Sequence, residues 1–156
     1  GVQTCALPIS GQVGAELAKR GAMVVCGGLQ GVMEAVCRGA KAEGGTTIGI
    51  MPGNEPISAN HYIDIPIMTG MGYARNVIVV KTGRAVIAID GAYGTLSEIG
   101  HALGDNIPVI GLKTWVLPPR SDLPIQMLGS DSATDAVDKA IAAALNRDIG
   151  AQQQSS

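Results

Sequence analysis

Two glycine-rich segments, each lying between an apolar run and a helical pattern, constrain the fold more than any other feature of this chain. Residues 27–31 follow the apolar run 22–26, and residues 90–94 follow the apolar run 84–89. Short continuous apolar runs are typical of parallel strands that helices cover on both faces. Because a helical pattern follows each glycine-rich segment, the sequence predicts repeated strand–turn–helix units.

The same alternation continues along the rest of the chain. Further strands are predicted over 46–51, 62–67, 108–112 and 125–128, and helices over 12–20, 32–43, 95–103 and from 132 onward. This order predicts an α/β fold, a Rossmann-like doubly wound parallel sheet in three α/β/α layers. Ligands bind such sheets at the carboxyl ends of the strands, so both glycine-rich turns are expected at the binding edge.

Two local patterns refine this outline. Residues 77–80 read Val-Ile-Val-Val, which fits a strand by propensity but also fits a helix over 72–82 with one buried face. Ser132 and Asp135 have the spacing of a capping box, which predicts the start of the last helix.

Composition limits the classes of function. The chain has 156 residues, a formal net charge of −2 and 15% charged residues, which suits one domain. Without a basic stripe, a nucleic-acid partner is not expected. There is no apolar run of about 20 residues and no basic signal-peptide start, so we expect a cytoplasmic protein with no membrane partner. Cys5, Cys26 and Cys37 are expected as free thiols, and no metal site is expected.

The first glycine-rich turn offers a candidate phosphate site. Gly27, Gly28 and Gly31 would let the backbone approach a ligand closely. The helix that follows offers unpaired N–H groups and a partial positive charge, which suit an anion. The alternative, a tight turn that serves geometry alone, remains open.

The second turn carries more chemistry. Its candidate ligand-binding residues are Gly91, Ala92, Tyr93, Gly94 and Thr95. Here Gly94, the Thr95 hydroxyl and the first N–H groups of the next helix can form an anion nest. Thr95 and Glu98 also have the spacing of a capping box, in which Glu98 bonds the backbone at Thr95. A capping role and a functional role for Glu98 both remain open.

Three segments together resemble the LOG-like (LONELY GUY) proteins of the SLOG superfamily, which are often called lysine decarboxylase-like. They are GGLQGVM at 27–33, MTGMGYARN at 68–76 and DGAYGTLSE at 90–98. The family motifs are GGxxGLM, a short Met/Arg motif and PGGxGTxxE. The resemblance covers about residues 11–145 and is closest to the branch similar to the molybdenum cofactor carrier protein. It implies that Met33 belongs to the ligand site, that 72–82 is helical and that the protein forms homodimers or higher homo-oligomers.

The resemblance implies one of two functions. The first is binding of a phosphorylated small molecule, such as molybdopterin or a nucleoside 5'-monophosphate, with no cofactor required. The second is hydrolysis of the N-glycosidic bond of a nucleoside 5'-monophosphate, with Glu98 as the carboxylate at the ribose and Arg75 orienting charge. Asn76 and Ala92 depart from the family's Lys and Gly, which favours binding. Lysine decarboxylation on pyridoxal phosphate needs a much larger fold, and a dehydrogenase needs a GxGxxG fingerprint that is absent here.

The ends of the chain carry separate expectations. Residues 1–9 match the translation of a widely used sequencing adapter, so 1–10 are expected to be foreign and the first strand of the relatives to be missing. Residues 11–147 are expected to form a single Rossmann-like domain. Residues 148–156 are expected to form a disordered tail.

Overall fold

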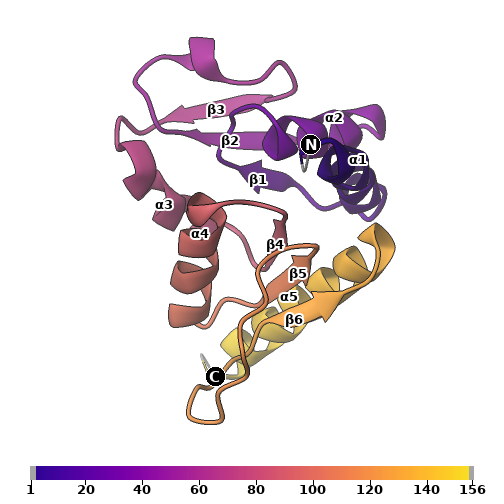
Figure 1. Cartoon of the computed structure of the whole chain (residues 1–156), viewed down its shortest axis with the longest axis vertical. Helices are drawn as coiled ribbons and strands as arrows, with labels where there is room; N and C mark the ends of the chain where they lie inside the picture. The colour runs from indigo at the N-terminus through magenta and orange to yellow at the C-terminus, as the bar shows by residue number, and fades with distance from the viewer. Residues whose placement is uncertain (1–2, 155–156) are drawn as a thin grey trace.

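The computed structural model describes residues 3–154, with side chains from Ala6 onward, as two three-stranded parallel sheets flanked by helices (Figure 1). Predictions for residues 1–2 and 155–156 lie outside the described residues. The helices and strands, in chain order, are α1 (Gln3–Lys19), β1 (Val24–Cys26), α2 (Val32–Ala42), β2 (Thr47–Met51), β3 (Ile65–Met68), α3 (Asn76–Thr82), β4 (Val86–Ile89), α4 (Tyr93–Gly104), β5 (Val109–Leu112), β6 (Leu128–Ser130) and α5 (Ala133–Gln154).

The strand order confirms the predicted α/β class. One sheet has the order β1-β2-β3 and the other β4-β5-β6, and every pair is parallel. β1 and β4 lie in the middle of the molecule, so the chain winds outward from the middle in two opposite directions (Figure 1). The one difference from the expected single sheet is that β1 and β4 belong to separate sheets.

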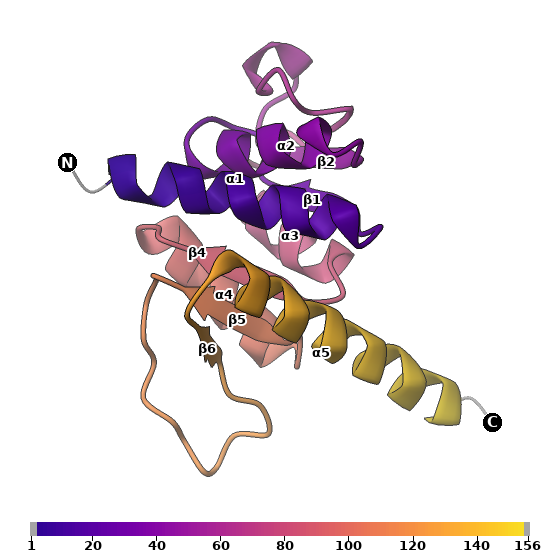
Figure 2. The ribbon, with the colours of Figure 1, turned by 90° about the vertical axis from the view of Figure 1, so that its right-hand side faces the viewer.

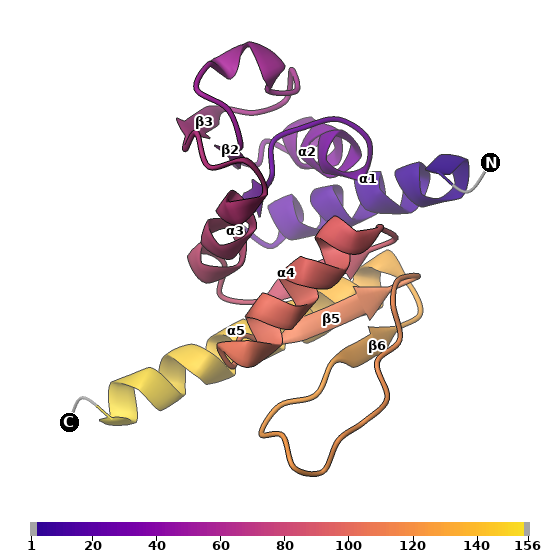
Figure 3. The same ribbon diagram turned by 60° about the vertical axis from the view of Figure 1, so that its left-hand side comes forward.

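Helices cover both faces of the strands. Helices α1, α2 and α5 form one layer, which faces the viewer in Figure 2, and α3 and α4 form the other, which faces the viewer in Figure 3. The first layer shares a core with Ile110 and Leu112 of β5 through Val13 and Val137. The second layer shares a core with β4 and β5 through Val80 of α3 and Ile99 of α4. Strands β4 and β5 therefore bury apolar residues on both faces, as their sequences predict.

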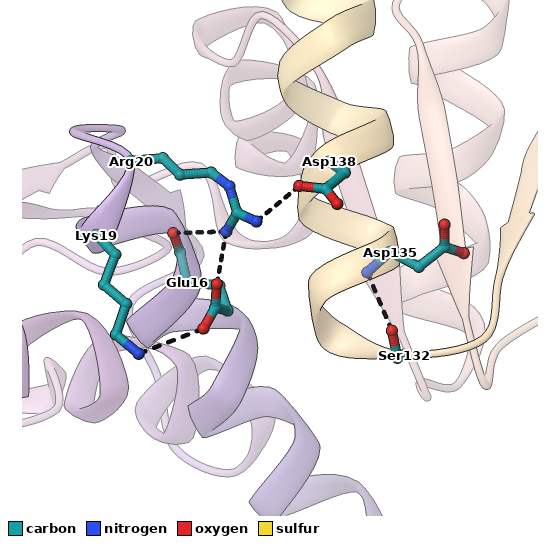
Figure 4. A network of polar contacts seen from close by, with 6 residues as sticks. All are labelled: Glu16, Lys19, Arg20, Ser132, Asp135 and Asp138. Carbon is teal, nitrogen blue, oxygen red and sulfur yellow. Dashed lines mark hydrogen bonds and ion pairs between the residues drawn. The ribbon is translucent and has the colours of Figure 1, made fainter.

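Polar contacts fix the two longest helices (Figure 4). The Ser132 hydroxyl accepts the N–H of Asp135 at 3.0 Å, so the predicted cap at the start of α5 is confirmed. Arg20, just after α1, pairs with Glu16 at 2.7 Å and with Asp138 of α5 at 2.6 Å. Exposed pairs of this kind contribute less than about 1 kcal/mol each, but this one joins helices from opposite ends of the chain.

Several predicted boundaries are wrong. Helix α1 begins at Gln3 rather than Gln12, so residues 3–10 form its first turns. The last strand is β6, not 125–128, because pairing with β5 selects Leu128–Ser130. Strand β3 likewise begins at Ile65, three residues later than predicted, because its pairing with β2 starts there.

The predicted disordered tail is also wrong as far as the structure describes it. Helix α5 continues to Gln154, through residues 148–154. Asp148 pairs with Arg84, and the Arg147 guanidinium donates to the Arg84 carbonyl at 3.0 Å. These contacts and good helix formers such as Ala and Gln extend the helix past the expected end.

The segment 72–82 is helical, as the resemblance implies. A 3₁₀ turn over Gly72–Arg75 leads directly into α3. Propensity favours a strand here, but packing decides, because Val80 is buried in the same core as Ile99. This helix places Arg75 and Asn76 beside both glycine-rich turns.

Two further expectations concern thiols and membranes. Cys26 and Cys37 are free thiols, with their Sγ atoms 3.6 Å apart; the side chain of Cys5 lies outside the described part. Across residues 3–154, no helix is both long and apolar enough to cross a bilayer.

Candidate functional site

Both glycine-rich turns line one cavity of about 770 Å³ that runs between β1 and β4. The turns lie at the carboxyl ends of these strands, where the direction of winding reverses, which is the usual ligand position in this class of fold. The predicted site residues that line the cavity are Gly27, Gly31, Met33, Arg75, Gly91, Gly94, Thr95 and Glu98. The structure thus brings together most residues that the sequence singles out.

Three predicted ligand residues are not among those lining the cavity. Gly28 has a φ of 76°, and a Cβ there would overlap the Met51 sulfur, so its smallness serves the packing of the turn. Ala92 and Tyr93 are exposed, and the Tyr93 ring packs 6.0 Å from the ring of Trp115. The proposed ligand contacts of these three residues have no support from the geometry.

The helices that begin at the two turns have open N-termini. Gly31 is the N-cap of α2 and Ala92 is the N-cap of α4, and neither makes a side-chain capping bond. The first N–H groups of a helix have no partner within it, so an uncapped helix start can bind an anion. Two such starts therefore border the same cavity.

The structure also settles the alternative reading of Thr95 and Glu98. Helix α4 begins at Tyr93, and the Leu96 N–H already donates to the Ala92 carbonyl at 3.1 Å. Thr95 therefore lies inside the first turn and is not the cap, so the capping-box interpretation is wrong. Glu98 is left without that structural role.

Arg75 is the buried cation of the site. Its side chain is only 7% exposed, and its Nη2 donates to the Gly27 carbonyl at 3.3 Å while Nη1 donates to the Asn76 side chain. Within the part of the chain that the structure describes, its Nε has no hydrogen-bond partner. A buried donor without a partner is costly, and so is a buried charge without a counter-ion. An anion in the cavity would accept a hydrogen bond from Nε and would neutralise the charge of Arg75.

Hydrogen bonds continue from Arg75 to the second turn. The Asn76 amide donates to the Ser97 hydroxyl at 3.2 Å, and that hydroxyl donates to the Gly94 carbonyl at 2.7 Å. We call Arg75, Asn76 and Ser97 the turn bridge, because they connect Gly27 to Gly94. Sequence reasoning missed this role of Asn76 and Ser97, since no local pattern signals a bond across 21 residues.

Glu98 is one of two acidic residues that line the cavity, and the other is Asp90. Burial raises the pKa of Glu98, and the nearby positive charge of Arg75 partly opposes that rise. A carboxyl group with a raised pKa keeps its proton to a higher pH than an exposed glutamate does. Arg75 and Glu98 thus supply one cation and one titratable acid at the same end of the cavity.

The rim beside the second turn includes two residues that the sequence analysis did not identify. The Trp115 indole N–H donates to the Ala92 carbonyl at 3.2 Å, and the Thr114 hydroxyl donates to the Asp90 carbonyl at 2.5 Å. Both follow the end of β5, so the rule that ligands bind at the carboxyl ends of strands could have indicated them.

The arrangement suits an organic anion with an apolar body. Uncapped helix starts and Arg75 provide the anion site, while apolar strand and helix residues provide the walls. Among the described residues, no group of three or more His, Cys, Asp or Glu side chains is placed to hold a metal ion.

Comparisons with known sequences agree with this outline. The profile of the SLOG cluster4 family matches residues 2–150. An uncharacterized protein of Archaeoglobus fulgidus is 45% identical over 109 residues, which are 70% of this chain and 72% of that protein. The cytokinin riboside 5'-monophosphate phosphoribohydrolase of Mycobacterium marinum is 34% identical over 96 residues, 60% of this chain. The chain thus spans about half, 51%, of that mycobacterial enzyme.

Comparisons with solved structures give the same fold. The molybdenum cofactor binding protein of Rippkaea orientalis matches with a TM-score of 0.79 and 33% identity, over 88% of this chain and 86% of that one. The molybdenum cofactor carrier protein of Chlamydomonas reinhardtii matches with a TM-score of 0.76 and 29% identity, over 90% and 89%.

Proposed function

Because the chain belongs to the SLOG cluster4 family, we propose that it binds a phosphorylated small molecule at the carboxyl ends of β1 and β4. The observation that carries this proposal is the buried guanidinium of Arg75, whose Nε lacks a partner among the described residues in a cavity bordered by two uncapped helices. A phosphate group supplies several acceptor oxygens and a negative charge, which match these donors.

Each part of the site has its own task in this proposal. The starts of α2 and α4 hold the phosphate through backbone N–H groups, with Gly94 and the Thr95 hydroxyl at the second turn. Arg75 neutralises charge, and the turn bridge keeps the two turns at a fixed separation. The apolar body of the ligand lies along the cavity walls.

The ligand class we favour is a phosphorylated pterin cofactor such as molybdopterin, which the protein would carry. The proteins of R. orientalis and C. reinhardtii, named for molybdenum cofactor binding and carriage, support this choice. Asn76 supports it as well, because it is bound into the turn bridge at the position where the hydrolase branch has a lysine. A nucleoside 5'-monophosphate is the second ligand class that fits.

Titration calorimetry with molybdopterin and with AMP tests this proposal. We expect saturable binding of one ligand per chain, and binding should weaken in an Arg75→Gln variant. Lys81→Gln is the matched control, because Lys81 pairs with Asp105 outside the cavity. If neither ligand binds, or if both variants lose affinity equally, the proposal fails. Sedimentation equilibrium of the same samples tests the predicted homo-oligomer.

A second candidate function is hydrolysis of a nucleoside 5'-monophosphate to free base and ribose 5-phosphate. The observation that favours it is Glu98, a half-buried carboxyl group with a raised pKa near the charge of Arg75. Such a group can act on the developing oxocarbenium ion or protonate the leaving base. The similarity to the M. marinum phosphoribohydrolase supports this reading.

Release of adenine from AMP separates the two candidates. If the protein is a hydrolase, we expect it to release adenine from AMP. The Glu98→Gln substitution should then lower the rate of release by about a hundredfold or more. Glu16→Gln serves as the matched control, since Glu16 lies outside the cavity and pairs with Lys19 and Arg20. Binding of AMP without release of adenine would leave the carrier reading.

A further inference from the structure

Two of the three cysteines of the chain lie side by side where β1 ends. Cys26 is the last residue of β1 and Cys37 lies in the middle of α2, and their Sγ atoms are 3.6 Å apart. Both are free thiols, and Cys37 is completely buried in a cluster with Val24 and Ala40. Packing as a small apolar side chain is enough to account for Cys37. It does not account for Cys26.

Cys26 differs from Cys37 in its accessibility. It is half-buried and lines the cavity beside Gly27. A small reagent in the cavity can therefore reach Cys26, whereas Cys37, which is 0% exposed, is sheltered behind it. One accessible thiol in contact with one sheltered thiol is the arrangement of a reactive cysteine and a resolving cysteine.

The surroundings of Cys26 favour its thiolate form. When Cys26 is ionised, the Cys37 thiol can only be a donor to it, and the Gly28 N–H donates to the same sulfur at 3.3 Å. The hydrogen bond from Cys37 lowers the pKa of the Cys26 thiol most, and the Gly28 N–H and the charge of Arg75 act in the same direction. Burial and the charge of Glu98 oppose this shift without reversing it. The thiolate is the form of cysteine that attacks an oxidant.

Cys37 has the opposite tendency. Its hydrogen bond to Cys26 raises the pKa of the Cys37 thiol, and burial adds to the rise. Cys37 therefore keeps its proton while Cys26 reacts. The two thiols differ both in accessibility and in charge, so their roles in an oxidation are not interchangeable.

We propose that Cys26 and Cys37 form a peroxide-sensitive site, at which oxidation joins β1 to α2 by a disulfide and thereby alters the first glycine-rich turn. The oxidant class is a hydroperoxide, of which hydrogen peroxide is the smallest member. The turn is affected because the Gly28 N–H donates to the Cys26 sulfur that changes its bonding. This inference concerns the two thiols and does not depend on the ligand of the proposed function.

The oxidation takes two steps. In the first, the Cys26 sulfur attacks one oxygen of hydrogen peroxide, so that an S–O bond forms, the O–O bond breaks and the leaving hydroxide takes up the thiol proton as water. In the second, the Cys37 sulfur attacks the Cys26 sulfur, the S–S bond forms, the S–O bond breaks, and the departing hydroxide leaves with the Cys37 proton as water. The two thiols lose two electrons, which reduce the peroxide to two water molecules.

The separation of the sulfur atoms suits the second step. A disulfide bond is about 2.05 Å long, and the two Sγ atoms are already in contact at 3.6 Å. Rotation about the two Cα–Cβ bonds supplies the remaining approach. No third reactant is needed after the peroxide has left as water.

Mass spectrometry of the chain treated with hydrogen peroxide tests the proposal. Cys5→Ser removes the third thiol, and trypsin leaves both remaining cysteines in one peptide, 21–38, because no lysine or arginine lies between them. We expect this peptide to lose about 2 Da, the mass of two hydrogens, and to resist alkylation until a reductant is added. Formation of sulfinic acid at Cys26 without the disulfide would overturn the proposal. So would an unchanged resonance of the Gly28 amide in the oxidised protein.

Two matched variants of that chain test the separate roles of the thiols. Cys37→Ala should leave a sulfenic acid at Cys26 that dimedone traps, while Cys26→Ala should slow the loss of the Cys37 thiol at least about tenfold. Equal rates of thiol loss in the two variants would contradict the assigned roles.

Oxidation of the two-thiol chain in urea provides a measurement that does not depend on the folding of either variant. We expect the disulfide to form at least about threefold more slowly there, because unfolding removes the contact between the thiols and the donors to Cys26. Equally fast formation in urea would show that the fold does not create the site, and the proposal would fail.

Discussion

The two glycine-rich turns follow similar strands, begin similar helices and border one cavity, but their glycines have different surroundings. In the first turn, a Cβ at Gly28 would overlap the Met51 sulfur, and one at Gly27 would crowd the Arg75 guanidinium. In the second turn, a Cβ at Gly94 would meet nothing within 4 Å. The first turn is thus closely packed at Gly27 and Gly28, while the second turn is open at Gly94, although a Cβ at Gly91 would overlap the Thr95 side chain.

The backbone contacts repeat this contrast. The buried Asn60 holds the first turn, because its N–H donates to the Gly28 carbonyl at 2.9 Å and its side chain donates to the Leu29 carbonyl at 2.8 Å. The second turn is held at its rim by Trp115 and Thr114, which lie after β5. The comparison teaches that one residue type serves two purposes: glycine permits close packing at Gly28 and leaves open space beside the backbone at Gly94.

The largest expected effect is on the packed turn. Gly28→Ala should lower the free energy of unfolding by about 3 kcal/mol, because it combines a left-handed conformation with overpacking against Met51. Urea denaturation followed by circular dichroism measures the change. A loss below about 1 kcal/mol would show that Met51 moves aside and that the first turn is not rigid.

The next effect tests the link between the turns. Arg75→Lys keeps the charge but removes the planar donors that reach Gly27 and Asn76. We expect molybdopterin or AMP to bind about 30-fold more weakly, a cost of about 2 kcal/mol. Calorimetric titration measures this, with Arg120→Lys as the matched control because Arg120 pairs with Asp122 on an exposed loop. Unchanged affinity in Arg75→Lys would remove Arg75 from the proposed site.

The open turn should respond in the opposite way to the packed turn. Gly94→Ala should raise the free energy of unfolding by about 0.5 kcal/mol, because alanine reduces the entropy of the unfolded chain without a clash. Its Cβ should nevertheless weaken ligand binding about threefold, by standing where the phosphate approaches the backbone. Urea denaturation and calorimetry on the same variant provide both numbers. Destabilisation as large as that of Gly28→Ala would erase the contrast between the turns.

The smallest expected effect concerns the dependence of stability on pH. Burial raises the pKa of Glu98 above its ordinary value of 4.5, so the unfolded chain loses this proton first as the pH rises. Stability contributed by protonated Glu98 is therefore lost as the pH increases from 4.5 through the pKa of the folded state. Glu98→Gln should remove this decline in unfolding curves recorded from pH 4 to 8.

Glu16 is the control for this measurement, because its pKa is shifted in the opposite direction to that of Glu98. Hydrogen bonds from Arg20 and Lys19 lower the pKa of Glu16 below 4.5. Its contribution to stability is present above pH 4.5 and is lost as the pH falls through the lowered pKa. Glu16→Gln should thus weaken the acid dependence that Glu98→Gln leaves in place. The same change in both variants would contradict the assigned pKa directions.

The sequence was sufficient to predict the fold class and the meeting of the two turns. Both follow from parallel strands, whose carboxyl ends share one edge of the structure. The helix at 72–82 needed the resemblance, because the valines and isoleucine at 77–80 favour a strand by themselves. Packing of Val80 against Ile99 overrides that local preference.

What the sequence could not predict depends on contacts between distant segments. The start of α4 was misplaced because its N-cap is Ala92, which has no capping side chain, whereas Thr95 and Glu98 imitate a capping box. Asn76 was identified only as a departure from the family motif, yet it binds Ser97 in another helix. Strand β6 is short and partly exposed, so its position depends on pairing with β5 more than on its own residues.

Trp115 is an intrinsic fluorophore beside the second turn. It is the one tryptophan of the chain, and its indole donates to the Ala92 carbonyl at the start of α4 beside the Tyr93 ring. Fluorescence excited at tryptophan wavelengths therefore originates from the rim of the cavity without any label. An event that displaces Ala92 alters the environment of this intrinsic fluorophore, so the protein carries its own optical probe of that helix start.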